Sequence, residues 1–162
     1  MKISILYHSV SGNTKTISQY VKEGIQKAGN IDVKIMSIDE VDEEFISESK
    51  AVIFGSPTYY ATMSWQMKKW FDTSSKIDLS DKLGACFATA NMLGGGSEIA
   101  QADMIHHMLV KGMLVYSAGA SKGQPYTHVG VSCIRDGDDF QKERAVIWGE
   151  RIGSKALELF DK

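Results

Sequence analysis

Residues 2–14 read KISILYHSVSGNT, and this stretch decides the fold. Its first half, Lys2 to Tyr7, is short, apolar and prone to form a strand. His8 to Thr14 is a polar loop, and residues 14–28 then carry apolar side chains at the four-residue spacing of an amphipathic helix. A strand, a short polar loop and a helix in this order predict the first unit of an α/β fold.

The rest of the chain repeats this alternation. Four further strands are predicted at 32–36, 51–55, 84–90 and 113–116, and helices at 14–28, 41–49, about 63–74, 99–111 and 138–160. Residues 117–137 are Gly-rich and are predicted to be irregular. The pattern predicts an α/β fold with a doubly wound five-stranded parallel sheet and helices on both faces, in a single domain spanning residues 1–162.

The loop at residues 8–14 offers three hydroxyl groups, a side-chain amide and a glycine at the start of a helix. Unpaired backbone N–H groups and the helix dipole make such a terminus attractive to an anion. The loop contains no Lys or Arg, and it matches neither GxxxxGK[ST] nor GxGxxG. A phosphate held by neutral donors is one interpretation, and a polar turn that caps the helix is the other.

Two later loops also follow predicted strands. In Gly55 to Met63 (GSPTYYATM), Pro57 fixes the chain direction, Thr58 can hydrogen-bond a polar ring edge, and two tyrosines offer aromatic faces. Thr89 to Glu98 (TANMLGGGSE) has three glycines that permit close backbone approach to a flat ligand. Each loop also has an ordinary interpretation when it is taken singly. The tyrosines could simply pack against the protein, and the glycines could simply begin a helix. The carboxyl ends of parallel strands share one edge, so we expect all three loops to form one ligand site.

The three loops together resemble a known family. Ser9-x-Ser11-Gly12-x-Thr14 resembles the (T/S)-x-(T/S)-G-x-T phosphate loop of flavodoxins, and the two later loops are similar to segments of the WrbA-like quinone reductases. The resemblance runs from Lys2 to about Phe160 and implies a flavodoxin-like fold that binds FMN. The cofactor-binding residues that it implies are Ser9, Val10, Ser11, Gly12, Asn13, Thr14, Pro57, Thr58, Tyr59, Tyr60, Ala90, Asn91, Met92, Leu93, Gly94 and Gly95.

Composition narrows the classes of partner and the compartment. The 162 residues include 18 basic and 20 acidic side chains, a net charge of -2 that is too balanced to indicate nucleic acid as a partner. No apolar run approaches the length of a membrane span, and a strand-like run directly after Met1 predicts no signal peptide. Cys86 and Cys133 show no metal-ligand spacing. We therefore expect no metal and a cytoplasmic location.

Two functions fit an FMN protein of this kind. One is an electron carrier that serves a redox partner protein, which the short chain favours. The other is an NAD(P)H-dependent flavin or quinone reductase with a quinone-like acceptor, which the second and third loops favour. No catalytic residue stands out in either case, because the flavin supplies the chemistry. A flavin-free doubly wound binding domain ranks last, and the oligomeric state stays open.

Overall fold

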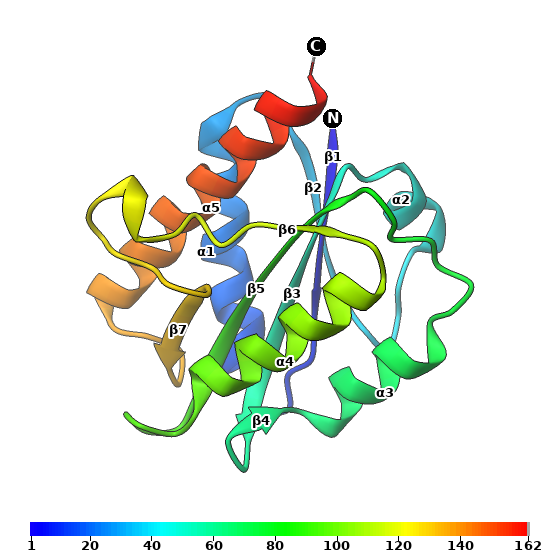
Figure 1. Cartoon of the computed structure of the whole chain (residues 1–162). Helices are drawn as coiled ribbons and strands as arrows, with labels where there is room; N and C mark the ends of the chain where they lie inside the picture. The colour runs from blue at the N-terminus through cyan, green and yellow to red at the C-terminus, as the bar shows by residue number, and fades with distance from the viewer. Residues whose placement is uncertain (162) are drawn as a thin grey trace.

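The computed structural model describes residues 1–161. Strands and helices alternate along most of the chain (Figure 1). The elements are β1 (Lys2–Tyr7), α1 (Asn13–Ala28), β2 (Asp32–Ser37), α2 (Glu43–Glu48), β3 (Ala51–Tyr59), β4 (Thr62–Met63), α3 (Trp65–Thr73), β5 (Leu83–Ala90), α4 (Ser97–Val110), β6 (Leu114–Val115), a 3-10 turn η1 (Ala120–Lys122), β7 (Val131–Ile134) and α5 (Asp139–Phe160).

The sheet has the order β2-β1-β3-β5-β6, and all neighbours along this path are parallel. Parallel pairing brings the carboxyl ends of β1, β3 and β5 to one edge, the lower edge in Figure 1. The loops that follow these three strands are the three that the sequence singled out. The predicted α/β fold with a doubly wound parallel sheet is therefore confirmed.

The sheet has seven strands where five were predicted. β4 pairs with β3 in an antiparallel hairpin, where the end of a loop and the start of a helix were predicted. β6 and β7 both pair with β5, at Leu83–Gly84 and at Phe87–Ala90, so two short pieces fill the fifth strand position. The prediction that 117–137 are irregular is wrong for Val131–Ile134. Four residues inside a Gly-rich stretch give no periodic signal, and their pairing depends on an edge that β5 provides.

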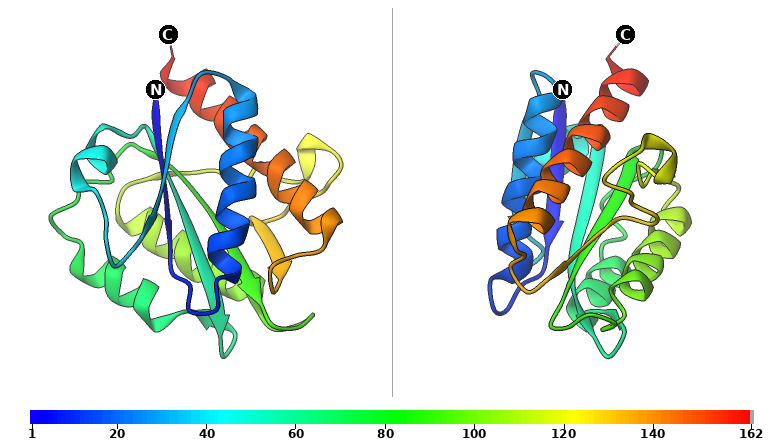
Figure 2. Two further views of the ribbon diagram at one scale, coloured as in Figure 1. Left: turned by 180° about the vertical axis from the view of Figure 1, so that it is seen from behind. Right: turned by 90° about the vertical axis from the view of Figure 1, so that its left-hand side faces the viewer.

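Helices cover both faces of the sheet (Figure 2). α1 and α5 pack on one face around Ile3, Ile5 and Trp148, all fully buried. α3 and α4 pack on the other face around Leu6 and Phe54, also fully buried. Alternate residues of β1 thus serve opposite cores, as strand geometry requires. Within residues 1–161, no helix is long and apolar enough to cross a membrane.

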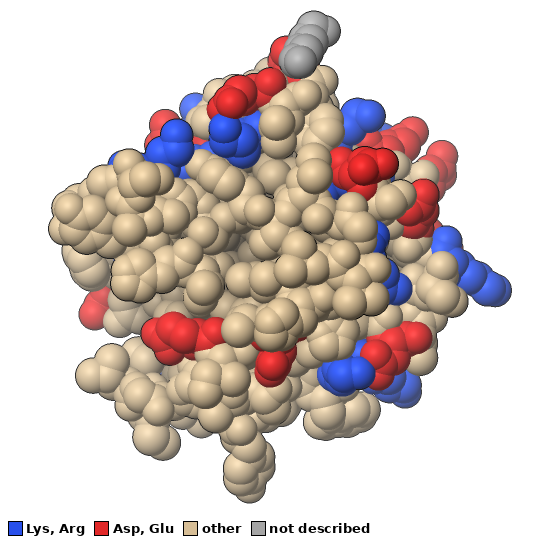
Figure 3. Space-filling model, viewed as in Figure 1, with Lys and Arg blue, Asp and Glu red and all other residues tan. Residues whose placement is uncertain are grey.

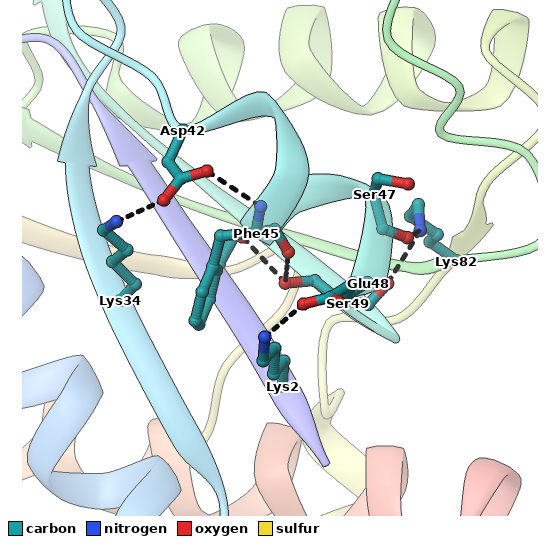
Figure 4. A network of polar contacts seen from close by, with 9 residues as sticks. Lys2, Lys34, Asp42, Phe45, Ser47, Glu48, Ser49 and Lys82 are labelled. Carbon is teal, nitrogen blue, oxygen red and sulfur yellow. Dashed lines mark hydrogen bonds and ion pairs between the residues drawn. The ribbon is translucent and has the colours of Figure 1, made fainter.

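A polar network anchors the short helix α2 away from these loops (Figure 4). Asp42 caps the helix, because its carboxylate accepts a hydrogen bond from a first-turn backbone N–H at 2.9 Å. The Lys34 ammonium bonds the same carboxylate at 2.5 Å and is the main cause that lowers the pKa of Asp42. Lys2 pairs with Glu48, and Lys82 donates to two carbonyls at the end of the helix at 2.8 Å each. These contacts tie α2 to β1, β2 and the start of β5.

Candidate functional site

A cavity of about 260 Å³ opens at the carboxyl edge of the sheet, where the first two loops meet the end of β5. None of its lining side chains carries a formal charge. The lining residues are Ser9, Val10, Ser11, Asn13, Thr14, Pro57, Thr58, Tyr59, Thr89, Ala90 and Asn91.

One wall of the cavity is the N-terminus of α1. Gly12 precedes the helix with φ 91°, a left-handed conformation that favours glycine, and no side chain caps the helix. In the first main-chain hydrogen bond of α1, the Thr16 N–H donates to the Gly12 carbonyl at 2.9 Å. The backbone N–H groups of the helix before Thr16 therefore lack an acceptor within the helix. Added atoms at Gly12 would meet nothing within 4 Å. This end of the helix can therefore receive an anion.

Hydroxyl groups hold the first loop to the end of β5. The Ser9 hydroxyl accepts a hydrogen bond from Gly12 N–H at 3.0 Å, which leaves its own O–H free to donate. The Thr14 and Thr89 hydroxyls share a hydrogen bond of 2.9 Å, and both side chains are buried. Thr89 was missed among the predicted site residues. The sequence feature that could have indicated Thr89 is a hydroxyl side chain next to the end of an otherwise apolar strand.

Thr58 lines the cavity and carries an unpaired polar atom. Its hydroxyl is buried and has no hydrogen-bond partner among residues 1–161. A buried unsatisfied hydroxyl costs about 1–3 kcal/mol, so a ligand that bonds it recovers that energy. The neighbouring Ser56 hydroxyl accepts a hydrogen bond from Ser64 N–H at 2.9 Å, which fixes the hairpin that carries Thr58.

The β3–β4 hairpin separates its two tyrosines. Tyr60 and Ala61 form the turn with φ 49° and 62°, values that non-glycine residues rarely adopt. Tyr59 lines the cavity, whereas the Tyr60 side chain is 104% exposed. A Cβ at Gly96 would lie 2.6 Å from the Ala61 Cα, so only glycine lets the second and third loops touch.

The structure brings ten of the sixteen predicted residues to the cavity wall. Gly12, Tyr60 and the four residues Met92 to Gly95 do not line it, and the last four belong to the loop between β5 and α4. Met92 and Leu93 are exposed there. Arg135, which the sequence did not single out, lies alongside, because its backbone N–H donates to the Ala90 carbonyl at 2.8 Å. Only the pairing of β7 with β5 places it there.

Groups of catalytic type do not converge on the cavity. Burial raises the pKa of both Cys86 and Cys133 to about 12, so both thiols stay protonated and unreactive. His8, the first residue of the first loop, is buried outside the cavity lining, and burial lowers its pKa against a smaller opposing effect of Asp39. Within the described residues, no cluster of His, Cys, Asp or Glu could hold a metal ion.

An uncharged anion site at the first helix of a doubly wound sheet, beside a hairpin with an aromatic residue, defines a mononucleotide-binding α/β protein. Comparison with known proteins narrows this class. A sequence model of the flavodoxin domain matches residues 4–107. A flavodoxin from Clostridium saccharobutylicum is 50% identical over 160 residues, which cover 99% of this chain and 100% of that protein.

More distant relatives share nearly the full length. An NAD(P)H dehydrogenase (quinone) from Archaeoglobus fulgidus is 25% identical, with 98% of each chain covered. The solved structure of an archaeal flavodoxin superposes with a TM-score of 0.78 at 26% identity, covering 96% of this chain and 99% of that one. The chain belongs to the flavodoxin family. It is an FMN-binding electron-transfer protein, and the predicted resemblance and cofactor are thereby confirmed.

The residues present fit FMN. The open space before Gly12 and the free N–H groups of α1 suit a phosphate group. The unpaired Thr58 hydroxyl and the aromatic face of Tyr59 suit the polar and flat parts of the molecule.

Proposed function

We propose that the chain is a single FMN-binding domain, residues 1–162, that carries electrons to and from a redox partner protein. The observation that carries the proposal is the cavity at the carboxyl edge, where the free α1 terminus, the unpaired Thr58 hydroxyl and Tyr59 converge. When bound, FMN supplies reversible electron storage in its ring system.

Individual residues have distinct roles in this proposal. Ser9, Ser11 and Asn13 bond the phosphate together with the backbone N–H groups of the first turn of α1. Thr58 bonds a polar edge of the flavin, and Tyr59 lies against its ring. Five of the other predicted residues form the walls of the cavity, namely Val10, Thr14, Pro57, Ala90 and Asn91. The rest are assigned to the rim outside it, namely Gly12, Tyr60, Met92, Leu93, Gly94 and Gly95.

A carrier fits this chain better than a reductase. The relative with 50% identity over nearly the whole chain is a flavodoxin. The relative named as an NAD(P)H dehydrogenase (quinone) is only 25% identical. The free, buried thiols of Cys86 and Cys133 favour a reducing compartment, and we propose the cytoplasm.

Purified protein, incubated with excess FMN and FAD and then desalted, tests the cofactor assignment. Mass spectrometry of the released flavin should find FMN, at one per chain. NADH and NADPH consumption is then followed with a soluble naphthoquinone as acceptor. We expect negligible consumption until a separate NADPH-dependent flavoprotein reductase is added. Tight binding of FAD alone contradicts the site, and catalytic consumption by the protein alone contradicts the carrier role.

The two tyrosines give a matched pair of variants for the ring contact. Tyr59→Ala should raise the Kd of FMN about tenfold, because aromatic contact and apolar burial are both lost. Tyr60→Ala should change it less than about twofold, because the Tyr60 side chain points away from the cavity. Titration of each apoprotein with FMN, followed by quenching of flavin fluorescence, measures both constants. Equal effects would contradict the assignment of Tyr59.

A further inference from the structure

A second cavity lies on the other side of the β3–β4 hairpin, between the hairpin and helices α3 and α4. Its volume is about 460 Å³, larger than that of the cavity at the first loop. We call it the hairpin pocket. Its apolar walls are Tyr60, Met63 and Trp65, and Tyr59 belongs to both cavities. The Trp65 side chain is 64% exposed, and with the exposed Tyr60 it forms an apolar surface at the mouth of the pocket.

The polar side of the hairpin pocket comes from α3 and α4. Lys68, Asp103 and His107 reach it. The Lys68 ammonium is already held by both carboxylate oxygens of Asp72 at 2.7 Å each, so its charge has a partner. Asp103 uses one carboxylate oxygen to accept a hydrogen bond from the Thr62 hydroxyl. Its other oxygen has no hydrogen-bond partner among the described residues.

His107 adds a second acceptor. Its Nδ1 lies 2.7 Å from the Asp103 carbonyl oxygen, and a carbonyl only accepts, so Nδ1 carries the proton. In the neutral ring Nε2 is then an acceptor, and no hydrogen bond to Nε2 exists within residues 1–161. Packing of the ring against Phe71, with centroids 5.0 Å apart, holds it in place. The pocket therefore combines aromatic walls with two acceptors that lack donors.

We propose that the hairpin pocket binds a small planar aromatic molecule that carries a hydroxyl donor, a phenol-type ligand. Aromatic and methionine walls fit a flat ring. The Asp103 carboxylate and the Nε2 atom of His107 accept the hydroxyl proton in a hydrogen bond, so a ring without a donor binds less tightly. A pocket that is mostly apolar with a few convergent polar groups is typical of small-molecule sites. The ligand contacts Tyr59 from the side opposite the cavity at the first loop, which goes beyond the proposed carrier role.

Two probes, one with a hydroxyl group and one in which a methyl group replaces the hydroxyl hydrogen, test the proposal. 1-Naphthol has the hydroxyl donor, and 1-methoxynaphthalene has a similar ring and no donor. FMN-loaded protein, its loading checked by the flavin absorbance, is titrated calorimetrically with each. We expect 1-naphthol to bind about fivefold tighter, which corresponds to the net contribution of one hydrogen bond. Protein labelled with ¹³C at the methionine methyls should show a shift of the Met63 signal and none of Met113, which does not line the pocket.

Variants of α4 test whether the two acceptors cause the preference for 1-naphthol or whether any change in α4 removes it. The double variant Asp103→Leu, His107→Phe keeps the apolar volume and should bind both probes equally. His106→Phe changes the exposed neighbour and should keep the preference for 1-naphthol. Circular dichroism and FMN affinity report whether each variant folds, so loss of the cofactor site is distinguished from loss of the pocket.

Three results would overturn the proposal. These are no binding of either probe at millimolar concentration, equal binding of both probes to the parent protein, and a shift confined to methionines outside the pocket. Sedimentation of the FMN-loaded protein gives a further check. A dimer in which Trp65 is protected from solvent quenchers would assign the pocket to an interface between copies instead.

Discussion

The Thr58 hydroxyl is buried without a partner, and this makes it a sensitive probe of ligand binding. Thr58→Val keeps the shape and removes the hydroxyl. The apoprotein should be as stable or more stable, because an unsatisfied group is removed. The Kd of FMN should rise about three- to tenfold, the value of one hydrogen bond. Thermal unfolding of the apoprotein and a flavin titration measure the two effects.

Thr73→Val is the matched control, because the Thr73 hydroxyl bonds the Lys69 carbonyl on an exposed turn of α3. It should leave FMN affinity unchanged. If Thr58→Val behaves in the same way, Thr58 does not contact the flavin.

His8 also carries buried polar atoms without partners, since neither ring nitrogen is bonded within the described residues. Its pKa is lowered from 6.5 mainly by burial, so the folded chain binds the proton at lower pH than the unfolded chain. The stability that the neutral ring contributes is therefore complete above pH 6.5 and falls as the pH drops through that value toward the lower folded pKa.

His8→Phe should remove this pH dependence and the unpaired atoms together. We expect the free energy of unfolding to rise by about 1 kcal/mol at neutral pH and to decline less on acidification. Urea unfolding of both proteins at several pH values from about 7.5 down to 5 tests this, because the other three histidines are present in both proteins and only His8 differs. Parallel curves for parent and variant would show that His8 is hydrated or bonded in solution.

At the scale of the elements, α1 and α5 touch backbone to backbone. A Cβ at Gly149 would lie 2.3 Å from the Val21 carbonyl oxygen, and one at Gly24 would lie 1.9 Å from the Val146 carbonyl oxygen. Backbone cannot yield as a side chain does, so an added methyl group must push the helices apart. This contact sets the position of α1, whose N-terminus forms the anion site.

Gly149→Ala should therefore destabilise the protein by about 2 kcal/mol, although alanine favours a helix by about 1 kcal/mol over glycine. FMN affinity should also fall, because α1 shifts. Ser154→Ala on the exposed side of α5 is the control and should slightly raise stability. Chemical unfolding and flavin titration of both variants measure these changes. A stabilised Gly149→Ala protein would mean that the helices separate without cost.

At the scale of the whole molecule, the loop residues that form the site carry no charged side chain, and Arg135 is a charged residue beside them. Residues 8–14, 55–64 and 89–97 contain no Lys, Arg, Asp or Glu, and the lower end of the molecule is free of these residues in Figure 3. Val10, Tyr60, Met92 and Leu93 are exposed at this end. The net charge of the chain is only -2. A partner protein that docks here meets an apolar rim and little electrostatic steering.

Electron exchange with a partner should accordingly depend little on salt. Between about 0.05 and 0.5 M NaCl the second-order rate constant for reduction of a basic c-type cytochrome should change less than about threefold. Leu93→Glu and Leu93→Lys should introduce salt dependence of opposite sign, which stopped-flow kinetics can measure. A tenfold fall for the parent protein would show that charges outside the three loops control docking.

Local sequence predicted the elements because their signals are local, and the resemblance of three short loops to flavodoxins implied the cofactor. The apolar run Lys2–Tyr7, the polar loop after it and the apolar spacing of α1 each depend on neighbours along the chain. The same holds for Thr58 and Tyr59 in the second loop. Strands β4 and β7 gave no such signal, because two and four residues are too few to show an alternating hydrophobic pattern. Their pairing also depends on another strand that is distant in the sequence or folded back on them.

The sequence alone determined the α/β class, the order of its main strands and helices along the chain, and three loops able to hold FMN. Tertiary structure decided which groups of those loops meet. It paired the Thr14 and Thr89 hydroxyls across 75 residues, turned Tyr59 inward and Tyr60 outward, and formed the hairpin pocket between α3 and α4. The physical reason is that burial and hydrogen-bond partners are properties of packed neighbours, and packing joins residues that are far apart in the chain.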